Sequence, residues 1–414
     1  MKTGILVLAD DFTGALDTGM QFAKNGAATI VTTDPDYNPA DDEIQVLVID
    51  TETRHKQPEE AAAVISAITA KAAESGTRIF YKKTDSALRG NIGAEIEAML
   101  RASKGKGVHF LPAFPKMDRI VQDGTLYVEG RPVADSVFGK DPFEPITRSR
   151  ISEILAQQTD IGVTVRNSAL KGCPPEGIIV YNTQTDAQMD DIVKDLDMDD
   201  GIVLLAGCAG LAASLGRLFF SGEEQTTLPR GEEGLLIVSG SVNEVTCEQI
   251  AAARKAGFGY RRLTNREKLT DYLKSEEGSD ALDRLCEEAF RERSYIIDTC
   301  DSQEEEMAAD RGAELGMSVR EVGEVIADTL AFTVNELLAR GINRMLLLTG
   351  GDVLYHTMER MGISALIPLA EVSPGVILTE FCYRGKRQYV LTKSGGFGDE
   401  QLLIRLNRML SCNC

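Results

Sequence analysis

One stretch of the chain decides its fold, and it reads Lys82-Lys83-Thr84-Asp85-Ser86-Ala87-Leu88-Arg89-Gly90-Asn91-Ile92-Gly93-Ala94-Glu95. It follows an apolar run at residues 79–81, which predicts a buried strand. It leads into apolar residues spaced as on one face of a helix, from Ile92 to Leu100. The carboxyl ends of strands in open α/β sheets are where ligands usually bind. A solvated loop with a helix cap is the simple alternative, but three cations beside a helix start favour a site for an anion.

Composition places the chain among packed, acidic proteins with more than one domain. Its 414 residues exceed one ordinary domain, and 43% hydrophobic with 26% charged residues is typical of a globular chain. The 64 acidic and 44 basic residues give a net charge of −20, which argues against nucleic acid or an anionic membrane as a partner. An anionic ligand would therefore need a locally basic pocket, such as the turn at residues 82–89.

The cysteines and the apolar segments both favour a cytoplasmic protein. The eight cysteines are scattered without a C-x-x-C pair, so neither a zinc site nor a disulfide framework is expected. The close pair Cys412 and Cys414 is expected to be frayed and reduced. The first apolar run ends at Asp10, too early for a signal peptide. Residues 201–220 could suggest a membrane span, but their four glycines and Arg217 favour a buried strand followed by a helix.

Strands and helices alternate along the first half of the chain. Strands are expected at residues 4–9, 28–32, 44–49, 79–81, 108–111, 162–165, 178–181 and 203–206. Helices are expected at residues 13–25, 58–76, 92–100, 147–158, 186–197 and 209–220, with an ordered loop at 119–130. This alternation predicts a largely parallel sheet with helices on both faces.

A short polar segment with Pro229 and Gly231 predicts a linker at residues 222–233, between an N-terminal domain (1–221) and a C-terminal domain (234–414). Beyond it the pattern restarts. Strands are expected at residues 235–238, 295–298, 345–348, 376–382 and 388–392, and helices at 245–256, 318–340 and up to 410. The predicted fold class is therefore two α/β domains, each with a largely parallel sheet flanked by helices, with the active site in the cleft between the domains.

Three loops of the first half follow strands and are expected at one edge of its sheet. They are Asp10-Asp11-Phe12-Thr13-Gly14, Asp50-Thr51-Glu52-Thr53-Arg54 and the turn at residues 82–89. A carboxylate or phosphate pairs best with a guanidinium, which nominates Arg54 and Arg89, whereas hydroxyl groups need acceptors, which nominates the aspartates. A paired Asp before Thr-Gly is more often a helix cap than a catalytic group, yet three such loops together favour a ligand site.

Three glycine-rich loops of the second half also follow strands. They are Ser239-Gly240-Ser241, Gly350-Gly351-Asp352 and Ser394-Gly395-Gly396-Phe397-Gly398. Glycines let backbone N–H groups approach phosphate oxygens, although tight turns that serve packing are the alternative. Neither the P-loop sequence nor a strand-following G-x-G-x-x-G occurs. The first half thus suits a small anionic polyol and the second half suits phosphates, which is the pairing that phosphoryl transfer needs.

The quoted residues resemble the four-carbon acid sugar kinase family over nearly the whole chain. The motifs that carry the resemblance are residues 9–15, 82–95, 112–115, 239–241 with Thr246 and Gln249, 350–352, 374–375 and 393–398. Members phosphorylate the terminal hydroxyl of acids such as threonate, erythronate or 3-oxo-tetronate with ATP. The resemblance implies that the N-terminal domain binds the sugar acid and the C-terminal domain binds ATP. One departure is Val353, near which many members have Thr or Ser.

The resemblance also implies roles for individual residues. Substrate contacts are expected from Asp10, Asp11, Arg54, Lys82, Lys83, Thr84, Asp85, Ser86 and Arg89, with Arg54 and a lysine on the carboxylate. Asp85 is expected to accept the hydroxyl proton, with Asp11 or Asp10 as the alternative. ATP is expected at Ser239, Ser241, Gly350, Gly351, Asp352, Val353, Gly395 and Gly396, with Mg²⁺ on its phosphates and its protein ligands left open.

Two other functions stay open as alternatives. One is a non-catalytic module that senses a sugar acid and a nucleotide. The other is an acid-sugar dehydrogenase, which the missing dinucleotide fingerprint disfavours. The expected partners are the sugar acid and ATP, and a homodimer is an open alternative to a monomer.

Overall fold

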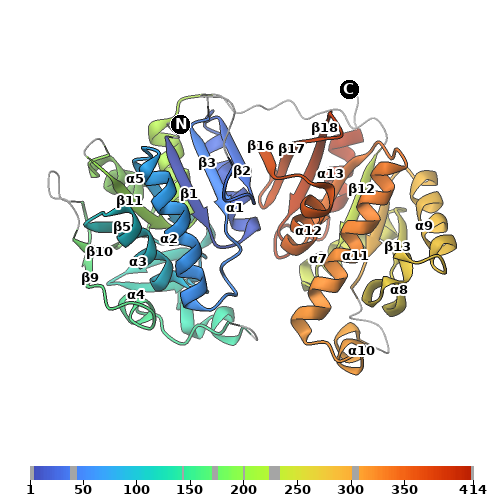
Figure 1. The fold of residues 1–414 in the computed structure, drawn as a ribbon, viewed down its shortest axis with the longest axis horizontal. Helices are drawn as coiled ribbons and strands as arrows, with labels where there is room; N and C mark the ends of the chain where they lie inside the picture. Colours follow the sequence, from blue (N-terminus) through green and yellow to red (C-terminus); the bar gives the residue numbers. More distant parts are fainter. Residues whose placement is uncertain are drawn as a thin grey trace. The chain divides into compact units, whose positions relative to one another are not determined.

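The computed structural model describes residues 4–37, 44–141, 144–169, 176–198, 201–222, 234–300 and 307–411. The chain forms two compact units, Met1–Gln225 and Thr226–Cys414 (Figure 1). The boundary between them falls within the predicted linker at residues 222–233, of which only Gly222 is described. The domain limits therefore stay a prediction. The terminal pair Cys412 and Cys414 also lies outside the described residues.

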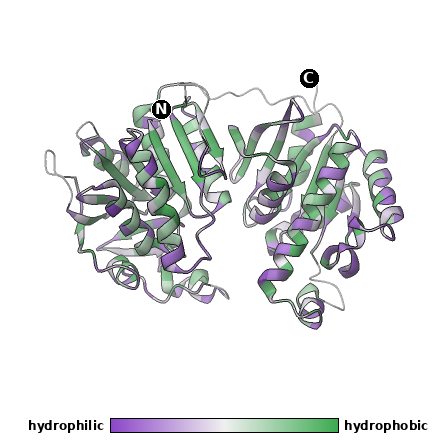
Figure 2. Cartoon of the chain, viewed as in Figure 1, coloured by the Kyte–Doolittle hydropathy of each residue, from purple (hydrophilic) through white to green (hydrophobic). Residues whose placement is uncertain are grey.

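Parallel strands form the main sheet of the first unit, as predicted. In spatial order they are β2 (Thr29–Thr32), β3 (Val46–Asp50), β1 (Ile5–Ala9), β4 (Ile79–Lys83), β11 (Val203–Gly207), β5 (Gly107–Leu111), β10 (Gly177–Tyr181) and β9 (Val163–Arg166). The strands are hydrophobic along most of their length (Figure 2). Every residue of β1, β3 and β11 is buried, which a parallel sheet covered on both faces requires.

Helices cover both faces of this sheet. They are α1 (Phe12–Ala23), α2 (Pro58–Glu74), α3 (Ile92–Ser103), α4 (Ile151–Leu155), α5 (Asp186–Asp195) and α6 (Ala209–Phe219). Two successive residues of β4 identify the faces, because neighbouring side chains of a strand point to opposite sides. The Lys83 ammonium lies against Gly14 of α1, whereas Lys82 pairs with Glu95 of α3. Helices α1 and α3 therefore lie on opposite faces.

Two local predictions for the first unit are wrong. Residues 119–130 do not form a loop but an antiparallel hairpin of β6 (Arg119–Gln122) and β7 (Thr125–Val128), joined by β8 (Arg131–Pro132). Asp123 and Gly124 both have positive φ, as the tight turn of a hairpin requires. The helix expected at 147–158 is confined to α4, because Arg150 is extended and bridges to Thr125.

The second unit has a mixed sheet. Its order is β13 (Gly259–Arg262), β14 (Tyr295–Asp298), β12 (Leu235–Ser239), β15 (Met345–Thr349), β18 (Lys386–Lys393), β17 (Val376–Tyr383) and β16 (Ala365–Ser373). The first five strands in this order, β13, β14, β12, β15 and β18, pair in parallel. Strand β17 pairs antiparallel with both β18 and β16. Strands β13 and β16 were not predicted from the sequence. Pro368 argues against a strand at β16, since proline cannot donate to a ladder.

The helices of the second unit are α7 (Glu244–Lys255), α8 (Asn265–Leu269), α9 (Ser279–Arg291), α10 (Ala308–Glu314), α11 (Val319–Ala339), α12 (Gly351–Met361) and α13 (Leu402–Ser411). Short 3₁₀ turns complete the described structure, at Pro115–Met117, Val133–Asp135, Val137–Lys140 and Asp271–Lys274. Helix α11 begins with the predicted capping box, in which Ser318 and Glu321 exchange hydrogen bonds. One hydrophobic core joins the central strands to α7 and α13, with Ile237, Leu391 and Leu403 among its buried members.

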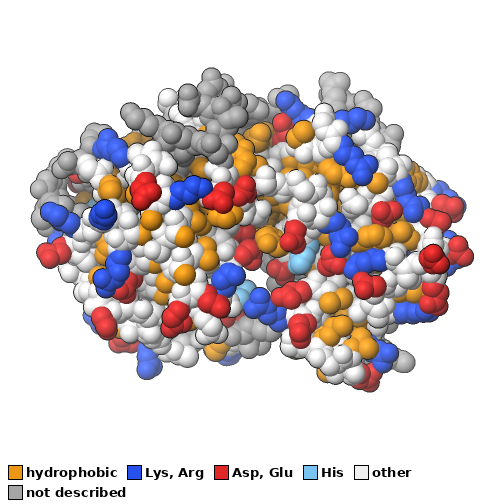
Figure 3. Space-filling model, viewed as in Figure 1, with side chains coloured by type: hydrophobic (Ala, Val, Ile, Leu, Met, Phe, Trp, Pro, Cys, Tyr) orange, Lys and Arg blue, Asp and Glu red, His pale blue; other side chains and the backbone are white. Residues whose placement is uncertain are grey.

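The apolar segment at residues 201–220 forms β11 and the 11-residue helix α6. Among the described residues, the helices are all too short or too polar to cross a membrane. On the face shown in Figure 3, acidic and basic side chains are interspersed over both units.

Candidate active site

The strand register brings the three predicted loops of the first unit to one edge of its sheet. Ala9, at the end of β1, pairs with Asp50 of β3 on one side and with Lys83 of β4 on the other. The loops that follow these strands therefore start at the same level. This confirms the expectation that the loops share one edge.

Arg54 lies at the centre of a carboxylate cluster on this edge. Its Nε donates to Asp10 at 2.8 Å, its Nη2 donates to Asp11 at 2.6 Å, and Nη2 lies 3.8 Å from Asp85. Burial opposes the charge, but Asp10 and Asp11 raise the pKa of Arg54 well above its usual value. Asn91 holds the loop in place, because its Nδ2 donates to the carbonyls of Thr53 and Lys56, each at 2.9 Å. The protein's own carboxylates thus neutralise Arg54.

Arg89 and Asp85 form a second tight pair. The guanidinium donates to Asp85 from Nε and from Nη2, both at 3.0 Å, and to Asp141 from Nη1 at 3.1 Å. Burial alone would raise the pKa of Asp85, but Arg54 and Arg89 hold it well below its usual range. Asp85 is therefore ionised but a weak base, and much of its hydrogen-bonding capacity serves to hold the arginine.

Lys82 and Thr84 are fully buried, and the direct substrate contacts expected of them stay a prediction. Lys82 points towards α3, where Nζ lies 3.1 Å from Glu95 and donates to the carbonyls of Leu8 and Lys83. Glu95 also accepts a hydrogen bond from Thr53. Burial raises the pKa of Glu95, although Lys82 opposes this shift. The Lys82–Glu95 pair therefore holds β4, α3 and the Arg54 loop together from below the site.

Lys83 differs from the other cations of this edge. Its side chain is 5% exposed, and among the described residues it forms neither an ion pair nor a side-chain hydrogen bond. A Cβ atom added to Gly14 would lie 2.6 Å from Lys83 Nζ, so the ammonium lies against the first turn of α1. Asp11 caps this helix by accepting a hydrogen bond from the N–H of Gly14 at 3.2 Å. Lys83 and the positive end of α1 thus form a place for an anion.

The remaining predicted substrate residue, Ser86, is half-buried at the start of the turn. Two acidic residues of this site were not predicted. Asp50 is buried at the end of β3, and burial together with Glu52 raises its pKa well above the usual value. Glu95 lies on the buried face of α3. Each had a signal in the sequence, because an acid in an apolar strand or on an apolar helix face needs a partner.

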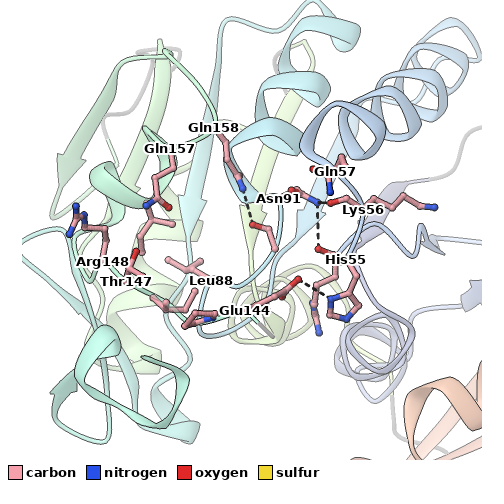
Figure 4. A pocket seen from close by; sticks show the side chains of 15 residues that line it. His55, Lys56, Gln57, Leu88, Asn91, Glu144, Thr147, Arg148, Gln157 and Gln158 are labelled. Carbon is pink, nitrogen blue, oxygen red and sulfur yellow. Dashed lines mark hydrogen bonds and ion pairs between the residues drawn. The ribbon is translucent and has the colours of Figure 1, made fainter. Parts of the chain in front are cut away.

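A pocket of about 340 Å³ lies beside this edge (Figure 4). The loop at residues 54–57, the turn at 88–91 and the segment 144–158 line it. His55 Nδ1 lies 2.8 Å from Glu144, and the Gln158 side chain donates to the carbonyl of Gly90. Of the predicted substrate residues, Arg54 alone lines the described pocket. The pocket therefore adjoins the Asp11–Lys83 site rather than enclosing it.

The glycine loops of the second unit converge on Ser241. A Cβ atom added to Gly395 would lie 2.9 Å from the Ser241 hydroxyl, and one added to Gly350 would lie 3.9 Å from the Ser241 nitrogen. Gly350 has a φ of 108°, which favours glycine, and it precedes α12 without a side-chain cap. The N–H groups of Gly351, Asp352 and Val353 at the start of α12 are therefore available to an anion.

Two of the predicted nucleotide residues do not present their side chains to a ligand. Ser239 is completely buried, and the Val353 side chain packs against Gly240. Thr246 and Gln249, which carry part of the resemblance, instead hold the third loop. The Thr246 hydroxyl donates to the carbonyl of Gly395 at 2.7 Å, and Gln249 donates to the carbonyls of Phe397 and Asp399 at 2.9 and 3.0 Å.

Comparison with known proteins finds a different domain family in each half of the chain. Residues 5–215 match the family described as a sugar-binding N-terminal domain, and residues 236–403 match a nucleotide-binding C-terminal domain. The D-threonate kinase of Salmonella typhimurium is 32% identical over 414 aligned residues, which cover 96% of each chain. The 3-oxo-tetronate kinase of Burkholderia multivorans is 26% identical over 94% of each chain.

A solved structure from Salmonella typhimurium LT2 has the same fold. It is 22% identical, covers 98% of this chain and 99% of its own, and superposes with a TM-score of 0.79. The two domain matches and the 32% identity extend over nearly the whole chain, in the order predicted from the motifs. The chain therefore belongs to the four-carbon acid sugar kinase family.

Proposed function

We propose that the protein uses ATP to phosphorylate the terminal hydroxyl of a four-carbon sugar acid, with D-threonate as the first substrate to test. The observation that carries this proposal is Lys83, a buried cation that lies against the first turn of α1, close to Asp11. Among the described residues, it forms neither an ion pair nor a side-chain hydrogen bond. A small anion that also carries hydroxyl groups would satisfy both side chains. The curated relatives named D-threonate kinase and 3-oxo-tetronate kinase support this substrate class.

The acid's carboxylate would pair with Lys83 and with the N-terminus of α1. Sequence reasoning favoured Arg54 for this role, but Arg54 is already neutralised by Asp10 and Asp11. Its function in the proposal is to hold these carboxylates in place, where they can accept hydrogen bonds from the substrate's hydroxyl groups. Arg89 does the same for Asp85, and the Ser86 hydroxyl completes the set of expected polar contacts.

Asp11 is the best placed of the three predicted proton acceptors. Its side chain is 25% exposed, against 9% for Asp85 and 1% for Asp10. Arg54 and Arg89 lower the pKa of Asp85, which makes it a weak base. Phosphoryl transfer has a loose transition state, so the acceptor has only to orient the hydroxyl and take its proton late. We therefore assign the proton to Asp11 and a positioning role to Asp85.

ATP would bind to the glycine loops of the second unit through backbone N–H groups at Gly351, Asp352, Gly395 and Gly396 and through the Ser241 hydroxyl. Among the described residues, there is no group of three or more His, Cys, Asp or Glu side chains arranged to hold a metal ion. Mg²⁺ would accordingly be carried mainly by the phosphates, with the exposed Asp352 as a water-mediated contact. Its chemistry would be to neutralise charge on the transferred group.

An assay of ADP release over a panel of four-carbon acids tests this function. We expect release that depends on both ATP and one acid of the panel, which contains D-threonate, D-erythronate and 3-oxo-tetronate. Binding of acid and nucleotide without ADP release would instead indicate a sensing module. Reduction of a nicotinamide cofactor by the same acids would indicate a dehydrogenase.

A further inference from the structure

Lys393 is a buried cation that neither the substrate site nor the nucleotide contacts above use. It ends β18 and is 3% exposed. Its Nζ donates to the Thr246 hydroxyl and to the carbonyls of Ser394 and Gly395, each at 3.0 Å. The Thr246 hydroxyl in turn donates to the carbonyl of Gly395. All three ammonium hydrogens are thus used on neutral oxygens, two of which belong to the glycine loop.

These hydrogen bonds determine which way the peptide groups of the loop face. In a trans peptide, the carbonyl of one residue and the N–H of the next point in opposite directions. Because the carbonyls of Ser394 and Gly395 point to Lys393, the N–H groups of Gly395 and Gly396 point away from it. Among the described residues, neither of these N–H groups has an acceptor. The loop therefore presents two adjacent donors on the side away from Lys393.

The charge of Lys393 lacks a counterion among the described residues. No carboxylate of the described residues forms an ion pair with it, and burial alone lowers its pKa to about 8. Its register neighbours on β15 and β17 are Thr349 and Val376, and its partner on α7 is Thr246, none of which is charged. A buried ammonium without a counterion is costly, so an anion bound at the loop would stabilise it.

We infer that Lys393 is a positioning residue for the nucleotide, which turns the N–H groups of Gly395 and Gly396 towards the phosphates and supplies the charge behind them. The inference rests on the proposed function, because the anion it requires is the polyphosphate of ATP. It adds a role that the lysine plays through the loop rather than by touching the phosphates.

Substitution separates this role from a general effect on the fold. Lys393→Met removes the ammonium but keeps an unbranched side chain, and we expect the Kd for ADP and the KM for ATP to rise about tenfold or more, with the KM for the acid unchanged. Lys386→Met is the matched control, since Lys386 is an exposed residue at the start of the same strand. Unchanged ADP affinity in a folded Lys393→Met variant would overturn the inference.

Proton uptake on nucleotide binding is a second test, because a lysine with a purely structural role would not change its protonation when ADP binds. Because burial lowers the pKa of Lys393 to about 8, nucleotide binding above pH 8 should raise this pKa and take a proton up. Calorimetry of ADP binding at pH 8.5, in buffers of different ionisation enthalpy, should show uptake of more than about half a proton. Lys386→Met should retain this uptake and Lys393→Met should lose it.

The outcomes distinguish the inference from the function on which it rests. Uptake below this level in the unaltered protein, or uptake that persists in Lys393→Met, overturns the role of Lys393 even where kinase activity is found. If Lys393→Met does not fold, the unaltered protein alone still decides the question through its proton uptake. A protein that binds no ADP refutes both proposals.

Discussion

The two candidate anion sites of this protein are built in opposite ways. In the first unit, charged side chains are paired with one another, with Arg54 on Asp10 and Asp11 and Arg89 on Asp85. In the second unit, backbone N–H groups of glycine loops form the site and one uncompensated lysine lies behind them. Side chains fixed by mutual pairing can distinguish the hydroxyl groups of a small acid, whereas backbone donors suit phosphate oxygens, which are alike in every nucleotide.

The largest effect is expected from Asp11→Asn, which removes the proposed proton acceptor but keeps its shape. Turnover should fall about a thousandfold with little change in the KM for either substrate, because the lost interaction serves the transition state. Steady-state kinetics measures this, and circular dichroism checks the fold. Near-normal turnover would return the role to Asp85.

The most deeply buried ion pair of the first unit, Lys82 with Glu95, tests how much the pairing of charges contributes to stability. Lys82→Met leaves Glu95 without its cation and should lower the free energy of unfolding by about 3 kcal/mol. Addition of Glu95→Gln should restore part of this loss, since no buried charge is then left unpaired. Urea unfolding followed by fluorescence measures both variants. The exposed pair of Arg320 and Glu324 is the control, and its removal should change stability by less than about 1 kcal/mol.

Lys83→Met tests whether the unpaired lysine of the first unit binds the acid. The KM for the sugar acid should rise about tenfold or more, while the KM for ATP changes little, because Lys83 lies at the first turn of α1 and not at the glycine loops. Lys71→Met on the exposed face of α2 is the control. An equal rise in both KM values would contradict a site specific for the acid.

The smallest effect is expected from the pH dependence that Asp85 contributes. Its pKa is lower in the folded protein than in the unfolded chain, so its stabilisation is present above about pH 4 and is lost as pH falls through the folded value. Asp85→Asn should therefore flatten the loss of stability on the acid side of pH 4. Thermal unfolding between pH 2 and 5 measures this, and an unchanged loss of stability in acid would show that Asp85 is not held by its arginines.

Much of the fold could be predicted from the sequence, because the spacing of apolar residues along the chain indicates which faces of strands and helices are buried. The alternation of apolar runs and amphipathic segments gave the parallel sheet of the first unit and the restart of the pattern beyond residue 233. The hairpin at residues 119–128 was missed, although Asp123-Gly124 is a turn signal. Strand β16 was also missed, since Pro368 reads against a strand.

The candidate site was predictable as a set of loops but not as a set of roles. Residues at the ends of β1, β3 and β4 were expected to meet, because parallel strands expose their carboxyl ends at one edge. The roles of Arg54 and Asp85 depend on which charges lie next to them in space, and spacing along the chain does not contain that information. The same holds for Lys393, whose partner Thr246 is distant in sequence.

Lys82 and Lys83 show what the sequence by itself determined and what only the tertiary structure decided. The sequence placed both lysines at the end of a buried strand, before a helix start where an anion is expected. Only the packing of the two helix layers separated them, since adjacent side chains of a strand point to opposite faces. One face carries α3 with Glu95, which neutralises Lys82, and the other carries the first turn of α1, against which the Lys83 ammonium lies.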